Sequence, residues 1–565
     1  MISTHCSISL PGFARLYATP QAQKTKSSAL LLSALVLCPF AHADNVVVGN
    51  GTPASCTEAA LNAAMFQLVV GVQGPGGVLT FSCGAAPHTI ALTSTKFLEG
   101  QCTIDGGGLI TLNGQGNTRP LYISVTNPED QTAVELRNIT LANGHGDFGG
   151  AVYLGENASL SVLRATIRNS SADFTGGGIA AAGNSLLNVA NSTFQDNFAV
   201  SGGAIVSYSV ANISDSSFEF NTANDATGAT SAVGGAVASF FGNLNVSRSF
   251  FGGNAADFGG AVYKENAELN LLGSRFFDNS ASSGGAVYLE SLSSPGEIEN
   301  SRFEENTASF FGGAISAINA IEVYGSLFQE NQAEFGGAIN LSPQLDSEIA
   351  NSAFIANHAG FSGGAIDAAG SGGGPLPPRL DLFQVTTNGN SADAFGGDLY
   401  LLGANPINAS ISYSTLVNAS SATGSTVSIG SGSSLGVAAS MIWASNGAAC
   451  SVESGGQLFT FDYNLAPASC GFGAAHDLFV SGFSQLGLAP LANNGGRFPT
   501  FLPQPNSPAT DRVSACVFKG GDTRGRPRPV DMDGNGSADC DTGAVERQLI
   551  ELVDDRIFAD AFDVP

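Results

Sequence analysis

The stretch that decides the fold is Phe276-Phe277-Asp278-Asn279-Ser280-Ala281-Ser282-Ser283-Gly284-Gly285-Ala286-Val287-Tyr288. It joins two short signatures, Phe-x-x-Asn and Gly-Gly-Ala-[Val/Ile], through a few small polar residues. The same pair of signatures recurs through the middle of the chain. Successive glycine pairs between Gly149 and Gly396 lie 24 to 33 residues apart. A repeat period in this range is typical of a solenoid.

Within each repeat, apolar residues occur in short runs bounded by Gly, Asn or Ser, as in Ala261-Val262-Tyr263 and Glu268–Leu272. Runs this short favour strands over helices. About three strands and three turns per repeat predict one coil of a right-handed parallel β-helix, with neighbouring coils ~4.8 Å apart. We therefore predict an all-β fold of the pectin lyase-like type. A short N-terminal capping helix and a disulfide-stapled C-terminal region are predicted to flank it.

The repeated residues have a structural interpretation. The Phe of each Phe-x-x-Asn is predicted to stack on its counterparts inside the coils, and the Asn to pass amide hydrogen bonds from coil to coil. The glycine pair permits a turn with positive φ and a close approach of the next coil. The residues predicted to form this structural ladder include Phe194, Asn197, Phe276, Asn279, Phe303, Asn306, Gly259, Gly260, Gly284 and Gly285.

The charge of the chain excludes several classes of partner. Its 21 Lys and Arg against 47 Asp and Glu give a formal net charge of −26. A protein this acidic repels nucleic acid and anionic lipid, and the sequence shows no basic patch. Acidic polysaccharides are disfavoured for the same reason, unless cations bridge the two.

The N-terminus has the pattern of a secretory signal peptide. Lys24 and Lys26 precede an apolar run from Ala29 to Cys38, which is followed by Ala41-His42-Ala43. A basic flank, a short apolar core and an Ala-x-Ala site predict cleavage after residue 43 and export of the chain. The run is too short to span a membrane, so the mature chain is predicted to have no transmembrane segment.

Cysteine usage agrees with export, because all seven cysteines after Ala43 lie outside the repeats. Pairing of neighbours would join Cys56 to Cys83, Cys450 to Cys470, and Cys516 to Cys540, and would leave Cys102 single. A Cys83–Cys102 bond is an alternative, since connectivity cannot be deduced from sequence. We expect the disulfides to act as staples at the two ends of the solenoid, where stacking neighbours are missing.

One segment, Ser55–Leu68, is predicted to be a helix because a polar cap and an early Glu precede dense helix formers. At the start of a solenoid it would cover the open end of the core. The predicted organisation is a signal peptide (1–43), a cap with the first coils (44–110), the repeat β-helix (111–440), a C-terminal region (441–546) and an acidic tail (547–565).

The alternating Phe-x-x-Asn and Gly-Gly-Ala-Ile signatures, over roughly residues 149–400, resemble the repeats of chlamydial polymorphic outer membrane proteins. The opening, with Ser55-Cys56-Thr57-Glu58 and Thr103-Ile104-Asp105-Gly106, resembles the head of secreted bacterial β-helix proteins. The polymorphic proteins end in an autotransporter barrel. The residues after Gly397 lack the series of alternating strands that a barrel needs, so self-translocation is not predicted.

A second resemblance covers residues 440–546. Its motifs occur in the order Cys450, Asp462–Leu465, Cys470, Pro490–Gly496, Asp522–Pro529 and Asp541–Glu546. They look like the choice-of-anchor Q region that closes many secreted bacterial β-helix proteins. This resemblance implies a protein at the cell surface or released from it, and implies no reaction.

One segment resembles half of a calcium loop. Its oxygen ligands would be Asp531, Asp533, Asn535, Asp539 and Asp541, with Gly536 at the sixth place. The twelfth place is Thr542 and not a bidentate Glu, so a polar turn tied by a disulfide is the competing interpretation. No other cofactor and no zinc site is predicted, because the cysteines and histidines are scattered.

Two further features could face a ligand. Acidic residues precede five of the glycine pairs, namely Asp147, Asp173, Asp257, Glu334 and Asp393, and a solvated edge is the favoured interpretation. The turns at Ser291–Gly296, Ser342–Ser347 and Gly370–Arg379 are enlarged at one repeat position. Stacked insertions can form a binding face, and tolerated drift in loop length explains them equally well.

The predicted function is that of an exported, non-catalytic protein in the extracellular space or on the outer-membrane surface of a bacterium. It would be an adhesin-like monomeric rod that binds an extracellular glycan, matrix or cell-surface protein. The alternative is a polysaccharide lyase or glycoside hydrolase of the same fold, but the few basic residues of the coils fall at unlike repeat positions.

Overall fold

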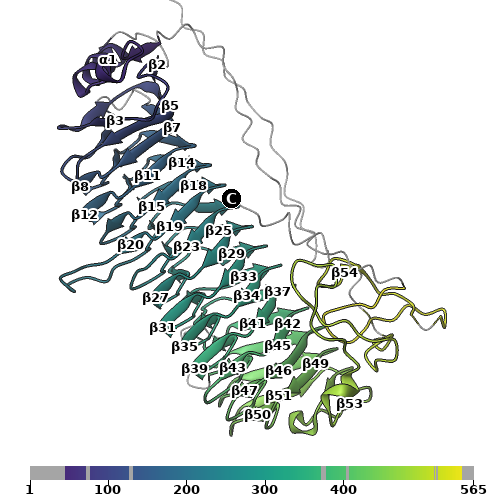
Figure 1. The fold of residues 1–565 in the computed structure, drawn as a ribbon. Coiled ribbons are helices and arrows are strands. Elements are labelled where there is room, and N and C mark those ends of the chain that lie inside the picture. The colour runs from purple at the N-terminus through teal and green to yellow at the C-terminus, as the bar shows by residue number, and fades with distance from the viewer. Residues whose placement is uncertain are drawn as a thin grey trace, which may run out of the picture. The chain divides into compact units, whose positions relative to one another are not determined.

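The computed structural model describes residues 45–70, 77–125, 132–370, 377–402, 406–514, 516, 520–532 and 534–549. The predicted signal peptide and residues 550–565 of the predicted tail lie outside these ranges. The described chain is a parallel β-solenoid, which confirms the predicted fold class. Figure 1 shows its strands stacked coil upon coil from α1 (Glu58–Val70) towards β50 (Cys450–Val452).

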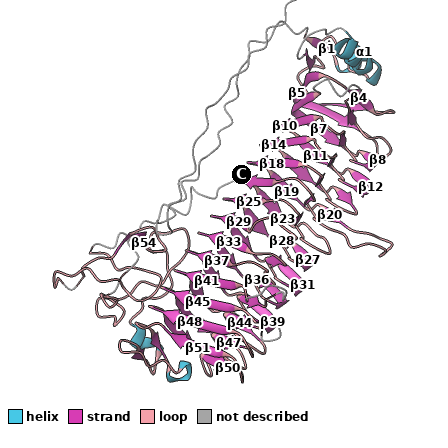
Figure 2. Cartoon of the chain, turned by 180° about the vertical axis from the view of Figure 1, so that it is seen from behind, coloured by secondary structure: helices cyan, strands magenta, loops and turns pink. Residues whose placement is uncertain are grey.

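The quoted stretch lies in one coil that visits three sheets. In this coil β25 (Leu269–Leu272) and β26 (Arg275–Phe277) belong to sheet A, β27 (Ser280–Ser283) to sheet C and β28 (Val287–Glu290) to sheet B. Sheet A has 30 strands, sheet B has 14, and sheet C consists of a four-stranded and a five-stranded piece. Figure 2 shows the same stack of strands from behind.

Two of the sheets carry the residues discussed below. The strands of sheet B are β4 (Lys96–Leu98), β6 (Leu121–Ile123), β9 (Val152–Leu154), β13 (Ile179–Ala181), β17 (Ile205–Ser207), β21 (Val237–Ser239), β24 (Val262–Glu265), β28, β32 (Ile315–Ala317), β36 (Ile339–Leu341), β40 (Ile366–Ala368), β44 (Leu399–Leu401), β47 (Val427–Ile429) and β50. Those of sheet C are β8 (His145–Phe148), β12 (Ser171–Thr175), β16 (Phe198–Ala199), β20 (Thr222–Ala223), β27, β31 (Thr307–Phe311), β35 (Gln332–Phe335), β39 (His358–Ser362) and β43 (Ser391–Ala392).

Neighbouring coils pair in register, so equivalent residues form columns. Phe276 lies opposite Phe303 in sheet A, and Val287 lies opposite Ile315 in sheet B. The rings of Phe276 and Phe303 are 4.8 Å apart with 3° between their planes, and both are fully buried. The column of buried rings begins at Phe194 and ends at Phe354. It supplies the aromatic core of the central coils.

A column of buried asparagines runs beside the rings. The side-chain Nδ2 of Asn279 donates to Oδ1 of Asn306 at 2.9 Å and to the carbonyl of Phe251. The same two bonds recur in each coil, starting from Asn197, whose Nδ2 donates to the carbonyl of Ile167. Each buried amide therefore finds its partners in the adjacent coils, as buried polar groups require.

The glycine pair at Gly396 is followed by Asp398 where most other repeats have Ala, and the contacts of this side chain explain the difference. Asn390 is the last asparagine of the column, and its Nδ2 donates to Oδ1 of Asp398 at 2.8 Å. The other carboxylate oxygen accepts from the hydroxyl of Thr387 at 2.6 Å. Burial raises the pKa of Asp398 to about 7, although these hydrogen bonds oppose the shift. Asp398 thus terminates the asparagine column.

The two glycines of each pair are required for different reasons. Gly284 has a φ of +63°, a backbone conformation that disfavours residues with a side chain. A Cβ on Gly285 would lie 2.1 Å from the carbonyl oxygen of Gly313 in the next coil. Gly259 and Gly260 repeat both features, with a φ of +64° and a distance of 2.2 Å to the next carbonyl.

Helix α1 begins at Glu58, three residues later than predicted. Ser55 belongs to a short 3-10 turn (Pro53–Ser55), and Thr57 caps the helix by accepting the N–H of Ala60 on its hydroxyl. The helix buries Leu61 and Met65 against the first coil. It therefore covers apolar side chains of that coil, as a solenoid end requires.

The disulfides join Cys56 to Cys83, Cys450 to Cys470, and Cys516 to Cys540. Cys102 is buried and unpaired, and burial raises the pKa of its thiol to about 12. A staple is expected at the end of the stack, but the third disulfide does not lie there. Cys540 packs with Tyr413 and Ala439 on the flank of sheet A, because the C-terminal residues fold back over it.

These C-terminal residues, 480–549, contact several coils of sheet A. Phe498 packs on Leu327 and Ala353. The N–H of Ala544 donates to the hydroxyl of Thr415 in β46 (Thr415–Ala419) at 3.1 Å. Figure 1 shows this part of the chain, with β54 (Gly520–Gly521), beside the later strands of sheet A. It covers outward side chains of these coils as well as ending the solenoid.

Candidate functional site

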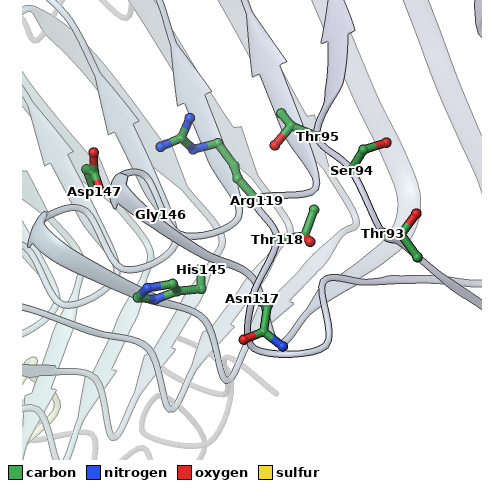
Figure 3. Close-up of a pocket in the computed structure, with 9 residues that line it drawn as sticks. All are labelled: Thr93, Ser94, Thr95, Asn117, Thr118, Arg119, His145, Gly146 and Asp147. Atoms are coloured by element: carbon green, nitrogen blue, oxygen red, sulfur yellow. The ribbon is translucent and has the colours of Figure 1, made fainter.

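A shallow polar pocket of about 350 Å³ lies on the first coils, where two turns between sheets A and B, residues 93–95 and 117–119, meet the start of β8 in sheet C. Each of three successive coils contributes one tripeptide, and Figure 3 labels the nine residues around the opening. The lining residues are Thr93, Ser94, Thr95, Asn117, Thr118, Arg119, His145, Gly146 and Asp147. The volume falls within the range of about 300–1,000 Å³ that is usual for small-ligand sites.

Helix α1 fixes the turn that contains Thr93, Ser94 and Thr95. Glu58 of α1 accepts hydrogen bonds from the backbone N–H of Thr93 at 2.8 Å and from its hydroxyl at 2.7 Å. It also pairs with Lys96 at 2.5 Å, and the Lys96 side chain is only 4% exposed. Burial alone would raise the pKa of Glu58, but the bonds from Lys96 and Thr93 lower it to about 2. The turn is therefore held by an ionised carboxylate.

Arg119 is the central charged group of the pocket. Its Nε donates to the carbonyl of Gly149 at 2.8 Å, and its guanidinium lies 5.7 Å from the ring centres of both Tyr122 and Tyr153. Burial lowers the pKa of Arg119, while the nearby Tyr122 and Asp147 raise it. Figure 3 shows the guanidinium extending towards the side of Asp147. Among the described residues, no carboxylate lies within ion-pair distance of Arg119.

Two of the acidic residues singled out from the sequence lie at this pocket. Asp147 lines it, and Asp173 of the next coil lies 3.7 Å from Nε2 of His145. The Nδ1 atom of His145 is 3.0 Å from the hydroxyl of Ser171. Asp257 has a structural partner, because its carboxylate accepts the N–H of Ala232. These three acidic residues therefore differ in their surroundings.

A second surface is the aromatic edge, which we define as Phe310, Phe311, Phe335, Phe361, Phe395 and Tyr400. It lies on four successive coils where sheet C gives way to sheet B. Ring centres of consecutive phenylalanines on these coils, starting from Phe311, are 5.4, 5.4 and 5.6 Å apart. Phe310 is 55% exposed and Phe361 is 41% exposed.

The rings of the aromatic edge are not equivalent. Phe311 and Phe335 stack with 26° between their planes, so they cover each other's faces. Phe361 is turned by 55° from Phe335 and by 63° from Phe395. Because Phe361 is tilted against both neighbours, its ring face is not stacked on either of them. It is the ring of the edge best placed to receive a flat apolar partner.

A buried carboxyl lies next to this edge. Asp367 is opposite Tyr400 in sheet B, and its side chain bonds to the hydroxyl of Ser362 in the turn that carries Phe361. Burial raises the pKa of Asp367 to about 7, although the bond from Ser362 lowers it. This carboxyl is therefore partly protonated at neutral pH.

The predicted calcium ligands are not arranged as one set of ligands in the described residues. Asp531 accepts the N–H groups of Gly534 and Gly536. Asp541 is fully buried, and its two oxygens accept the N–H groups of Asp511 and Arg547. Asp533 lies outside the described residues. The part of the chain that the structure describes contains no cluster of three or more His, Cys, Asp or Glu side chains suited to a metal ion.

The remaining loop residues of this segment bond locally. Asn535 Oδ1 accepts the N–H of Ser537, and the hydroxyl of Ser537 donates to Asp539. These contacts are those of a polar turn, which was the competing interpretation. Calcium binding by this loop stays a prediction, and Asp541 does not fit it as drawn.

Sequence reasoning missed Arg119 and His145. The available signal was one polar tripeptide in each of three successive coils. The tripeptides are Thr93-Ser94-Thr95, Asn117-Thr118-Arg119 and His145-Gly146-Asp147. These coils precede the regular repeats, so the period did not align them. The enlarged turns at Ser291–Gly296 and Ser342–Ser347 lie between sheets B and A, away from the aromatic edge.

Comparison with known proteins adds little beyond the fold. No family model and no curated protein matches this sequence, so the two resemblances of its motifs stay predictions. A tailspike protein mutant of E. coli bacteriophage HK620, in complex with a pentasaccharide, is similar with a TM-score of 0.34 and 14% identity. The match covers 70% of this chain and 74% of that chain. A similarity this distant carries no argument about a ligand.

Proposed function

We propose that this chain is an exported protein that binds an extracellular glycan on the lateral face of its solenoid, without a chemical step. The observation that carries the proposal is the aromatic edge. Folded proteins rarely leave contiguous aromatic rings exposed unless they meet a partner. Sugar rings have apolar C–H faces and polar rims, so they suit an exposed ring such as Phe361, with the carboxylate of Glu334 next to the adjoining Gly360.

Two further observations support export. The three disulfides are of the kind that form and persist outside the cytosol, and the N-terminal residues have the signal-peptide pattern described above. No helix within the described ranges is long and apolar enough to cross a membrane. The proposal therefore includes a location in the extracellular space or on the bacterial outer surface, as an adhesin-like or matrix-binding protein.

The alternative function, glycan cleavage, has one observation in its favour. A glycoside hydrolase needs a carboxylic acid that stays protonated near neutral pH. Asp367, with its pKa raised to about 7, lies next to the aromatic edge. Its side chain is only 5% exposed, and it is bonded to Ser362, so it does not face solvent as a proton donor to a bound glycan would. Binding without turnover is therefore the better-supported reading.

The test is to incubate the full-length chain with a panel of oligosaccharides, with and without calcium, and to score binding and cleavage together. We expect binding without product, and a loss of affinity on the order of tenfold in Phe361→Ala. For comparison, the stacking of a nucleobase on an aromatic side chain contributes about 1–3 kcal/mol. The matched control is Phe220→Ala, which removes a phenyl ring outside the edge that is more exposed than Phe361, 57% against 41%.

Three outcomes would contradict the proposal in different ways. Product formation that is lost in Asp367→Asn would establish the hydrolase alternative. Equal loss of binding in Phe361→Ala and Phe220→Ala would show that the aromatic edge is not the site. Absence of binding to every glycan of the panel would remove glycan recognition altogether.

A further inference from the structure

Arg119 differs from most of the other arginines of the coils. Five of them pair with carboxylates: Arg137 with Asp105, Arg248 with Asp215, Arg275 and Arg302 with Glu304, and Arg379 with Asp381. In a chain with 47 acidic against 21 basic residues, an acidic partner is the common condition of an arginine. Arg119 is instead held by the carbonyl of Gly149, while Asp147 is near but not paired with it.

The contacts of Arg119 fix its orientation without using its outer nitrogens. Nε is occupied by Gly149, and the guanidinium carbon lies 5.7 Å from the ring centres of both Tyr122 and Tyr153, whose rings stack at 4.9 Å. The two Nη groups have no hydrogen-bond partner among the described residues, and the guanidinium lines the pocket. A planar fork of N–H donors held in this way matches the two oxygens of a carboxylate.

We infer that this pocket binds the carboxylate of an acidic sugar residue at an end or branch of the glycan, with Arg119 as the bidentate partner. The inference rests on the proposed function and names its ligand class. Thr95 and Thr118 line the same opening and offer hydroxyls to the rim of the sugar. Glu58 holds the first turn of the pocket in place through Thr93, so the site is formed before the ligand arrives.

The surroundings limit the ligand to one acidic residue. The chain has a formal net charge of −26, and Asp147 and Asp173 lie beside the pocket. A polymer with a carboxylate on every residue would bring further negative charges against these groups. A single acidic residue on a neutral chain brings one negative charge, which Arg119 can pair. The net charge of the chain therefore disfavours polyanionic polysaccharides, but it does not exclude a glycan with a single acidic residue.

The experiment uses the full-length chain and three oligosaccharides that differ only in the terminal residue: glucose, glucuronic acid, or the methyl ester of glucuronic acid. Affinities are measured by titration calorimetry at low and high salt. We expect the acid to bind about tenfold more tightly than the other two, and this preference to weaken at high salt because Coulombic attraction is screened.

Variants assign the preference to the pocket. Arg119→Gln should abolish the preference for the acid over the glucose form, and Arg119→Lys should restore only part of it, because lysine keeps the charge but not the fork. The control is Arg164→Gln, which removes the same charge from an exposed arginine of a neighbouring coil that bonds only to Asn138. It should keep the preference.

The outcomes separate the inference from the proposed function. Equal binding of all three oligosaccharides would overturn the inference and leave glycan binding intact. An acid preference that survives in Arg119→Gln would also overturn it. Binding of none of them would contradict both. A circular-dichroism melting curve identical to that of the parent chain shows that Arg119→Gln is folded, so a lost preference then reports on the pocket.

Discussion

The coils between Gly149 and Tyr400 bond to their immediate neighbours, whereas residues 480–549 bond to coils far back in the chain. From Phe194 to Phe354 each coil passes one Phe stack to the next, and from Asn197 to Asn390 each passes one Asn hydrogen bond, as between Asn279 and Asn306. In contrast, Ala544 contacts a residue 129 positions earlier, and Gly521 contacts one 137 positions earlier. The coils repeat one set of contacts, whereas each contact of residues 480–549 with the coils occurs once.

Their charged residues differ in the same way. The ion pairs of the coils are partly exposed, as in Arg248–Asp215, whose side chains are 57% and 36% exposed. The C-terminal residues bury theirs completely: Arg528 pairs with Glu546 at 3.1 Å, and Asp522 pairs with Arg524 at 2.8 Å. Exposed pairs stabilise a fold little, while a buried charge that loses its partner is costly. The two regions should therefore respond differently to mutation.

The largest expected effect is that of Arg528→Met in the C-terminal region. Arg528 also donates to the carbonyls of Asp541 and Gly543, and its guanidinium lies 4.6 Å from the ring centre of Tyr413. Its loss leaves Glu546 buried without a cation, at a cost of about 3–5 kcal/mol. Hydrogen exchange should rise across 480–549 while the central coils stay protected. Loss of protection throughout the solenoid would mean that the two regions are not separable.

Asn306→Ala tests the coils and should cost somewhat less, about 2–4 kcal/mol, because it leaves two buried donors of Asn279 unsatisfied and removes the bond to the carbonyl of Phe276. Exchange should rise in the coils on either side of residue 306 and return to normal farther away, since stabilisation is shared between neighbours. A uniform rise would contradict this nearest-neighbour behaviour.

Asp398→Asn tests the end of the asparagine column through pH. Because burial raises the pKa of Asp398 to about 7 from the usual 3.8, the folded chain binds its proton more tightly than the unfolded chain. Stability should therefore fall as pH rises from about 4 to 7. Asn accepts the same bond from Asn390 without a charge, so the variant should melt a few degrees higher at pH 8 and show a weaker pH dependence, because Asp367 keeps its own raised pKa.

The control for this pH experiment is Asp196→Asn, an exposed carboxyl on a coil turn. It should leave the pH dependence of the melting temperature unchanged. A flat profile in the parent chain would show that Asp398 is not buried as a proton-binding group.

The smallest expected effect is that of Arg248→Gln, the exposed counterpart of Arg528. Both N–H···O bonds of Arg248 to Asp215 are 2.7 Å long. Even so, we expect a change below about 1 kcal/mol, because exposed pairs gain little over their hydrated states. Chemical denaturation would measure it. A loss as large as that of Arg528→Met would erase the distinction between the two regions.

The sequence by itself determined the solenoid. A repeated Phe-x-x-Asn and glycine pair places identical groups opposite each other in a parallel, in-register stack, so spacing alone implies the column of Phe276 and Phe303 and the column of Asn279 and Asn306. The glycines follow from local sterics, namely the positive φ of Gly284 and the close carbonyl above Gly285. Neighbour pairing of the cysteines was one of the arrangements that the sequence left open.

Only the tertiary structure decided the rest. It brought Arg119, His145 and Asp147 into one pocket from coils with no regular period, buried Lys264 against the carbonyl of Glu265, and folded residues 480–549 onto the side of sheet A. Such contacts join residues that share no repeat position. Periodicity specifies what lies directly above a residue in the stack, but which irregular turns converge depends on the lateral geometry of each coil.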